Sequence, residues 1–77
     1  MIGMEKGQND TAVRLGCKIV KIRKGKGIKQ IDLAAFVNID DASLRRIESG
    51  RTNPTVKTLE KIAQALEVSI KDLFDFE

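Results

Sequence analysis

Arg45 and Arg46, adjacent in the chain, are the residues whose type and spacing could do chemistry most directly. A guanidinium presents a planar set of donors, which can bind O6 and N7 of guanine in the major groove of DNA or hold a phosphate. On a helical wheel both arginines lie opposite the aliphatic pair Leu44 and Ile47. A helix that is held by two aliphatic residues and turns arginines outward is typical of DNA recognition.

Catalytic and metal chemistry, by contrast, lacks the side chains that it needs. The sequence has no histidine, tyrosine or tryptophan, and one cysteine, Cys17. A Cys-His nucleophile, a histidine-based metal site and a zinc cluster therefore cannot form within one chain. Asp40 and Asp41 are adjacent, but they stand at a predicted helix start. We expect no enzyme activity, no metal and no cofactor.

The arginines belong to the second of two short helices that are joined by a tight turn. The first helix begins near Lys29 or Gln30, and Asn38 can adopt the left-handed conformation that ends it. Asp40 can cap the second helix, which covers about residues 41–49. The apolar periodicity of both helices places one set of side chains in a shared core: Leu33, Ala34, Val37, Leu44 and Ile47.

Helical patterns also cover the rest of the chain. Residues 1–9 lack periodicity and are predicted to form a flexible tail, with Asp10 as the N-cap of the first helix. Thr55 is the predicted cap of a fourth helix, and Ser69 that of a short final one. No alternating run of β-branched residues indicates a strand. The sequence predicts an all-α fold, a compact five-helix bundle that forms a single domain over residues 10–77.

Length and composition set the broad class. A chain of 77 residues with a hydrophobic fraction of 42% suits one globular domain with a small core. No apolar run approaches the ~20 residues of a membrane span, and no leader marks a signal peptide. We expect a soluble, intracellular protein without a membrane partner, and a single cysteine suits a reducing cytoplasm. The net charge of +3 is uneven, because residues 11–31 are basic and residues 60–77 mostly acidic. This distribution suits a polyanion on one side only.

A set of motifs runs through most of the chain. It comprises Leu15-Gly16-x-x-Ile19-x-x-Ile22-Arg23, Gly27-Ile28-x-Gln30-x-x-Leu33-Ala34, Leu44-x-Arg46-Ile47-Glu48-x-Gly50-x-x-Asn53-Pro54 and Leu59-x-x-Ile62-Ala63-x-Ala65-Leu66-x-Val68-Ser69. On these residues the chain resembles the phage repressor and Cro-type helix-turn-helix family, also called Xre-like. The resemblance implies a lambda-repressor-like bundle that binds double-stranded DNA through its second and third helices, usually as a dimer on a palindromic operator. It implies a transcriptional regulator of the cytoplasm, associated with the nucleoid.

The resemblance also assigns candidate DNA contacts. Gln30 corresponds to a phosphate contact at the start of the second helix. Asp41 and Ala42 correspond to base-reading positions, although Asp41 could equally stabilise the helix dipole. Arg46 matches a base-reading position, whereas Arg45 could read a base or hold a phosphate. A solvated surface role is the alternative for Gln30 and for each of Arg51, Thr52, Asn53 and Lys57. The whole candidate set, with the last four as phosphate contacts, is Gln30, Asp41, Ala42, Ser43, Arg45, Arg46, Ser49, Arg51, Thr52, Asn53 and Lys57.

Arg23 and Glu48 lie at the edges of the core stripes of their helices. This geometry, together with a matching arginine and glutamate in the family, predicts an ion pair that ties the first helix to the third. The pair would fix the recognition helix against the bundle.

The C-terminal segment is more apolar than so small a core can absorb. Val68 and Leu73 are expected to face the core, while Ile70, Phe74 and Phe76 are predicted to form the interface of a symmetric homodimer. In the alternative, the two phenylalanines fold back to complete the monomer core. An apolar stripe on the first helix is a competing surface for the dimer: Val13, Cys17 and Val20.

Two other functions fit the same features. An antitoxin would bind a partner toxin and also repress its own operon, with residues 1–9 and the apolar C-terminal end as the segments that could hold the toxin. A restriction–modification controller would share the fold, and the sequence does not separate it from other regulators.

Overall fold

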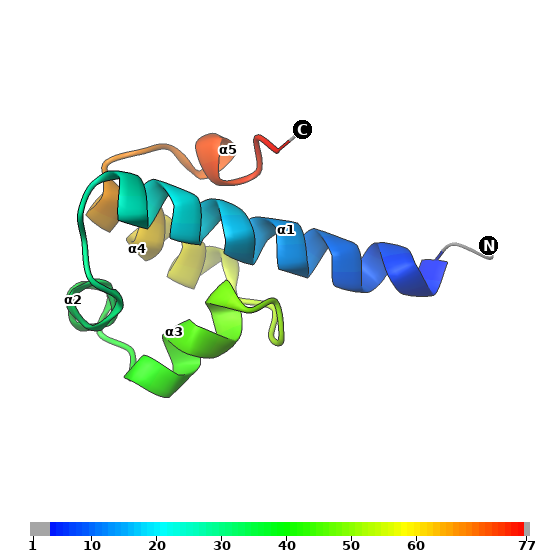
Figure 1. Cartoon of the computed structure of the whole chain (residues 1–77), viewed down its shortest axis with the longest axis horizontal. Coiled ribbons are helices and arrows are strands. Elements are labelled where there is room, and N and C mark those ends of the chain that lie inside the picture. The colour runs from blue at the N-terminus through cyan, green and yellow to red at the C-terminus, as the bar shows by residue number, and fades with distance from the viewer. Residues whose placement is uncertain (1–3, 77) are drawn as a thin grey trace.

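The protein is described by a computed structural model, which covers the backbone of residues 4–76 and the side chains of residues 11–76. Its five helices (Figure 1) are α1 (Met4–Gly25), α2 (Gln30–Val37), α3 (Asp41–Glu48), α4 (Val56–Leu66) and α5 (Ile70–Leu73). This part of the chain contains no strand, so the predicted all-α, five-helix fold is confirmed. None of its helices is both long and apolar enough to cross a membrane.

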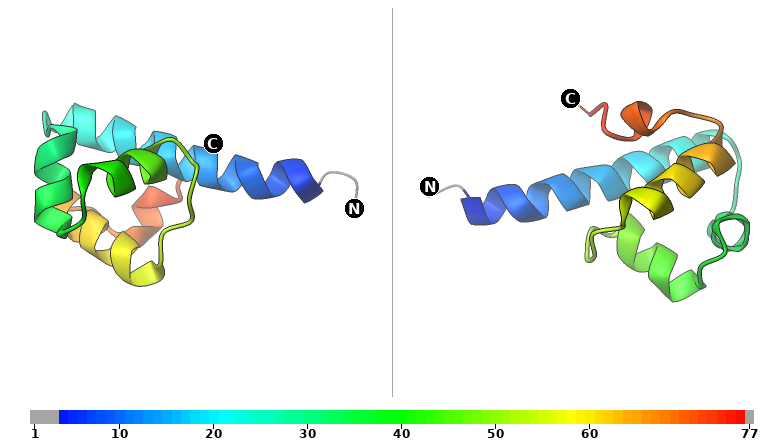
Figure 2. Two further views of the ribbon diagram at one scale, coloured as in Figure 1. Left: turned by 90° about the horizontal axis from the view of Figure 1, so that it is seen from below. Right: turned by 180° about the vertical axis from the view of Figure 1, so that it is seen from behind.

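α1, the longest helix, packs on α3 and α5, and α2 packs on α3 and α4. In Figure 1, α5 lies above α1 and α3 below it, while α2 is seen end-on beside the C-terminal end of α1. The right-hand view of Figure 2, seen from behind, shows α4 in front of α1. α4 therefore lies on the side of the bundle that faces away from the viewer in Figure 1. Every helix contributes at least one fully buried aliphatic side chain to the common core, among them Ile19, Leu33, Leu44, Ile62, Leu66 and Leu73.

The start of α1 differs from the prediction. The helix begins at Met4, so residues 4–9 are helical and Asp10 lies inside the helix instead of capping it. The predicted tail is therefore wrong from Met4 onward, and residues 1–3 lie outside the described residues. The cause is local, because this segment has no proline and contains several good helix formers. Figure 1 shows this end of α1 projecting beyond the other helices.

The other predicted helix ends are confirmed. Asn38 closes α2 in the left-handed conformation, at φ 66°. Asp40 accepts a hydrogen bond from a backbone N–H in the first turn of α3, at 3.2 Å. Thr55 caps α4 in the same way, and Ser69 forms a reciprocal capping box with Asp72. These caps fix where each helix starts, and therefore which side of α3 faces outward.

α1 and α3 approach each other closely at Gly16. A Cβ added there would meet the carbonyl oxygens of Glu48 and Ile47, the latter at 2.6 Å. Both oxygens belong to the backbone at the end of α3, so no side-chain rotation could make room. Gly16 therefore sets the distance between α1 and the end of α3.

The C-terminal segment packs partly on its own core. Leu73 is fully buried and Val68 partly buried, as predicted. Ile70 and Phe76 are also partly buried against the core. Phe74 remains 42% exposed, with its ring centroid 6.2 Å from that of Phe76. Of the three residues predicted to form a dimer interface, Phe74 is the one that is largely available on the surface.

Candidate nucleic-acid interface

The side of α3 that faces away from the core carries two arginines. Arg45 and Arg46 are exposed, whereas Leu44 and Ile47 are buried, so the predicted orientation of α3 is confirmed. A shallow, open depression of about 550 Å³ lies over this surface. Its walls come from α3, from the start of α2 and from the loop after α3: Gln30, Ala42, Arg45, Arg46, Glu48, Ser49 and Arg51.

The other predicted DNA contacts do not line this depression. Asp41 and Ser43 are half-buried in the first turn of α3. Thr52, Asn53 and Lys57 follow the end of α3, and of these Thr52 is half-buried while the other two are exposed. Contact with DNA stays a prediction for all eleven candidate residues, whether or not they line the depression. Glu48 also lines the depression, although its predicted role was the ion pair with Arg23 and not a contact with DNA.

Arg46 is partly held in place by its neighbours on α3. Its Nη2 donates to the hydroxyl of Ser43, one turn earlier, at 3.4 Å, which is a long bond in solvent. The hydroxyl of Ser49 donates to the backbone carbonyl of Arg46 at 3.2 Å. Of these two bonds, the one to Ser43 directs the guanidinium toward the start of α3, the end of a recognition helix that usually meets base edges.

The carboxylate of Asp40 caps the start of α3. Hydrogen bonds from the side chain and the backbone N–H of Ser43 hold the pKa of the Asp40 carboxyl below its ordinary value of 3.8, and Arg46 lowers it slightly further. Asp40 is therefore ionised at neutral pH, where it complements the positive end of the helix dipole. Its predicted role as a cap is confirmed.

The start of α2 is built differently. Lys29 occupies the N-cap with an extended backbone, and its side chain makes no capping hydrogen bond. A lysine has no acceptor to offer, so the first N–H groups of α2 receive no bond from the cap side chain. A helix start of this kind suits an anion such as a phosphate.

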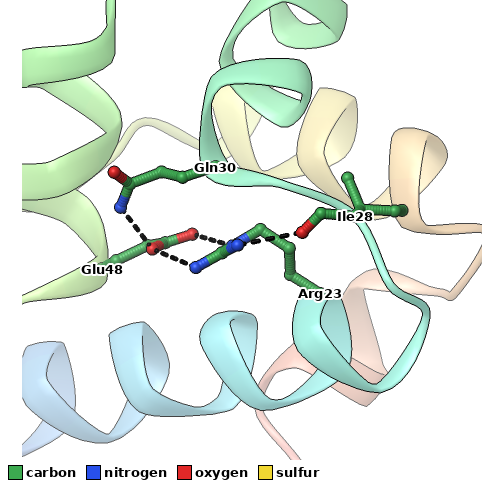
Figure 3. Close-up of polar contacts among 4 residues, drawn as sticks. All are labelled: Arg23, Ile28, Gln30 and Glu48. Atoms are coloured by element: carbon green, nitrogen blue, oxygen red, sulfur yellow. Dashed lines mark hydrogen bonds and ion pairs between the residues drawn. The ribbon is translucent and has the colours of Figure 1, made fainter.

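A buried polar network joins α1, α2 and α3 (Figure 3). Arg23 donates from Nε to Glu48 Oε2 at 2.8 Å and from Nη2 to Glu48 Oε1 at 3.1 Å. Its Nη1 donates to the carbonyl of Ile28 at 2.9 Å. Arg23 is 7% exposed and Glu48 is 8% exposed. The predicted ion pair between α1 and α3 is confirmed, as a bidentate and buried one.

Gln30 is a further member of this network, which sequence reasoning missed. Its Nε2 donates to Glu48 Oε1 at 2.7 Å. The two residues are 18 positions apart and lie on different helices, so no helical spacing relates them. A signal was nevertheless present, because each residue separately matched a family motif.

Comparisons with known proteins agree with this geometry. Residues 19–73 match the family described as Helix-turn-helix (HTH_3). Control protein C.MunI of Mycoplasma sp is 36% identical over 67 residues, which cover 86% of this chain and 90% of that protein. The HTH-type transcriptional regulator y4dJ of Sinorhizobium fredii is 39% identical over 59 residues, 77% of each chain.

A solved structure is similar over almost the same region. The crystal structure of the restriction-modification controller protein C.AhdI from Aeromonas hydrophila has a TM-score of 0.80 and 28% sequence identity to this chain. The match covers 82% of this chain and 96% of C.AhdI. The chain therefore belongs to the helix-turn-helix family of DNA-binding transcriptional regulators, and α2 and α3 form the motif that gives this family its name.

Proposed function

We propose that the protein regulates transcription by binding a specific operator through the outward side of α3. The observation that carries this proposal is the depression walled by Arg45, Arg46 and Arg51. Guanidinium groups have donors and no acceptor, and DNA offers matching acceptors on guanine edges and phosphates. Such a protein works where the chromosome lies, in the cytoplasm and on the nucleoid.

Different residues of this surface read bases and hold phosphates. Arg46 reads base edges, because its guanidinium is directed toward the start of α3. Arg45 reads a base or holds a phosphate, and Asp41 either accepts from the N4 amine of cytosine or stabilises the helix dipole. Phosphates are held around the reading surface, by the start of α2 and by the loop and helix start after α3. The loop and helix-start contacts are Arg51, Thr52, Asn53 and Lys57.

Selection from a random duplex pool, followed by a salt titration, tests the proposal. A single preferred sequence should emerge, and the logarithm of its affinity should fall linearly with the logarithm of the salt concentration. Lys57→Ala should weaken preferred and random duplexes alike and reduce the salt slope by about one. An affinity that stays flat from low to high salt would contradict DNA binding by this surface.

A homodimer is the form proposed to bind the operator, because one recognition helix reads too few base pairs to select a single genomic site. A groove of about 330 Å³ between α1 and the C-terminal segment supports it. Val13, Cys17 and Phe76 line this groove together with the charged residues Arg14, Lys18, Lys21 and Asp75, and the Phe74 ring contacts that of Phe76. The two surfaces that the sequence offered as alternatives are thus neighbours. In the dimer, the two α3 helices would lie about one DNA turn apart, ~34 Å.

Sedimentation at high micromolar concentration tests this dimer. The wild type should sediment as a dimer, and Phe74→Glu should sediment as a monomer. Phe36→Glu is the matched control, because Phe36 is 80% exposed and lines a different groove, between α2 and α4. A monomeric wild type would refute the dimer, and a dimeric Phe74→Glu would place the interface elsewhere.

A restriction–modification controller is the second candidate, favoured by the match to the restriction-modification controller protein C.AhdI. This chain spans 90% of C.MunI and 96% of C.AhdI. Mapping the sites that the protein binds in its native host tests this candidate. A bound site upstream of a restriction or methylation gene would support a controller, whereas a set of sites that includes none would contradict one. The antitoxin alternative predicts instead a stable 1:1 partner that co-purifies and covers Phe74.

A further inference from the structure

Three cations of α1 lie away from the surface proposed to bind DNA. Arg14, Lys18 and Lys21 line the groove between α1 and the C-terminal segment, and none of them lines the depression over α3. In Figure 1 and in the right-hand view of Figure 2, α5 and α3 lie on opposite sides of α1. A role in the recognition surface therefore does not account for these three charges.

This α1 groove combines apolar side chains with an excess of positive charge. The apolar lining residues are Val13, Cys17 and Phe76. The guanidinium of Arg14 lies 5.7 Å from the centroid of the Phe76 ring. Among the described residues that line the groove, Asp75 is the one carboxylate, against three cations. Lys18 and Lys21 form no salt bridge within the part of the chain that the structure describes. The groove therefore suits an occupant that is both apolar and acidic.

The C-terminal segment has the complementary composition. Residues 72–77 contain two phenylalanines, three carboxylates and no cation. Phe74 is 42% exposed, and Asp75 is exposed as well. Asp72 is already engaged in the capping box with Ser69. Phe74 and Asp75 therefore offer an exposed aromatic ring next to an exposed carboxylate, which matches the chemistry of the groove.

We propose that the α1 groove of each protomer receives the C-terminal segment of a second copy of this chain. The partner's Phe74 packs against the apolar residues of the groove, and the partner's Asp75 lies beside Lys18 and Lys21. The contact is made twice about a two-fold axis, because groove and segment are neighbours on one surface. The inference rests on the proposed homodimer and identifies the ring and the charges that hold it together. Both α3 helices stay available to DNA, because the groove lies away from them.

Such an interface differs from a purely apolar one in its response to salt. Attraction between exposed charges is screened as the salt concentration rises, and the Debye length falls to ~3 Å at 1 M salt. Apolar contacts are not screened in this way. The dissociation constant of the wild-type dimer, measured by sedimentation, should therefore rise severalfold between low salt and about 1 M sodium chloride. This measurement needs no variant, so it does not depend on the folding of one.

Two charge-reversed proteins test whether the charges meet between protomers. In Lys18→Glu/Lys21→Glu the groove and the segment are both net negative, and in Asp75→Lys/Glu77→Lys both are net positive. Each variant alone should dimerise more weakly than the wild type, by at least on the order of tenfold, because like charges face each other. An equimolar mixture of the two should form a heterodimer, because each groove then meets a segment of opposite charge.

Lys24→Glu/Lys26→Glu is the matched control for the change of net charge. Both lysines are exposed and neither lines the groove, so this protein should dimerise like the wild type. Melting temperatures, measured alongside, show whether each variant is folded. Should a charge-reversed variant be unfolded, Lys21→Ala and Asp75→Ala take its place, and each should reduce the salt dependence of dimerisation.

Three results would overturn the inference. If each charge-reversed variant dimerises as the wild type does, groove and segment do not meet. If both variants are monomeric and their mixture stays monomeric, the charges act within one chain. If the wild-type dimer is insensitive to salt but is broken by Phe74→Glu, the proposed homodimer stands and its contact is apolar alone. A monomeric wild type would instead refute the homodimer itself, and that outcome is visible before any variant is measured.

Discussion

Glu48 and Arg46 are two positions apart on α3, and their charges are held in opposite ways. Glu48 is 8% exposed and accepts hydrogen bonds from Arg23 and Gln30. Arg46 is exposed, and its guanidinium makes one long bond to Ser43. The buried side of the helix is tied to two other helices, while the exposed side keeps its donors available. The buried Glu48 thus fixes the position of α3. Arg46 can therefore bind a ligand without any movement of the helix backbone.

Removing the buried charge should have a larger effect on folding stability than removing the exposed one. Glu48→Ala leaves the guanidinium of Arg23 buried without its partner, which typically costs about 3–5 kcal/mol of folding stability. Glu60→Ala is the matched control, since Glu60 is an exposed glutamate on α4. Thermal melting should show a large fall in Tm for Glu48→Ala and a small one for Glu60→Ala. Equal falls would mean that the network contributes no more than a surface charge.

Removing the exposed charge should alter recognition and leave folding intact. Arg46→Ala should lose roughly 1–3 kcal/mol of binding free energy on the preferred duplex and relax selection at one position of each half-site. Its Tm should match that of the wild type, because Arg46 faces away from Leu44 and Ile47. An equal loss on every duplex would instead make Arg46 a phosphate contact, and the contrast between the two sides would then concern stability alone.

The smallest effect is expected at Asp40, where the cap and the exposed side of α3 meet. The pKa of Asp40 is lowered by the hydrogen bonds from Ser43, so the cap stabilises the folded protein above the unfolded-state pKa. That contribution is lost as the pH falls through the folded-state pKa. Asp40→Ala should lower Tm by a few degrees at neutral pH, with a difference from the wild type that shrinks below about pH 4.

Asp40→Asn separates the cap from its charge. Asparagine caps a helix without titrating, so this variant should remove the part of the acid-induced loss that Asp40 causes while it retains α3. If Asp40→Ala differs from the wild type by the same amount at pH 3 and pH 7, the carboxylate does not act through its ionised form.

Features that depend on neighbours in the sequence were predictable. Asp40, Thr55 and Ser69 each cap the helix that follows within three residues, and such contacts are largely decided by residue type and spacing. Asp10 shows the limit of this reasoning. A cap residue starts a helix where the preceding chain is extended, and here the residues before it are helical from Met4.

Features that depend on how helices meet were predictable in part. The ion pair between Arg23 and Glu48 followed from wheel positions and from the family resemblance together. The bond from Gln30 to the same carboxylate depends on the angle between α2 and α3, which no periodicity encodes. The fate of the last phenylalanines was equally open, because the chain leaves helical geometry at Phe74 and a wheel no longer says where Phe76 points.

The contact at Gly16 has a consequence for the motions of α3. An isolated helix of 8 residues is unstable in water, so α3 exists through its packing. Because the backbone of its last turn lies directly against α1 at Gly16, α3 can open only if that contact between main chains separates. The buried amides of α3 should therefore exchange their hydrogens with solvent at the rate of the whole domain, in one cooperative unit with α1. If α3 opens only when the whole domain unfolds, it meets every DNA sequence in the same conformation.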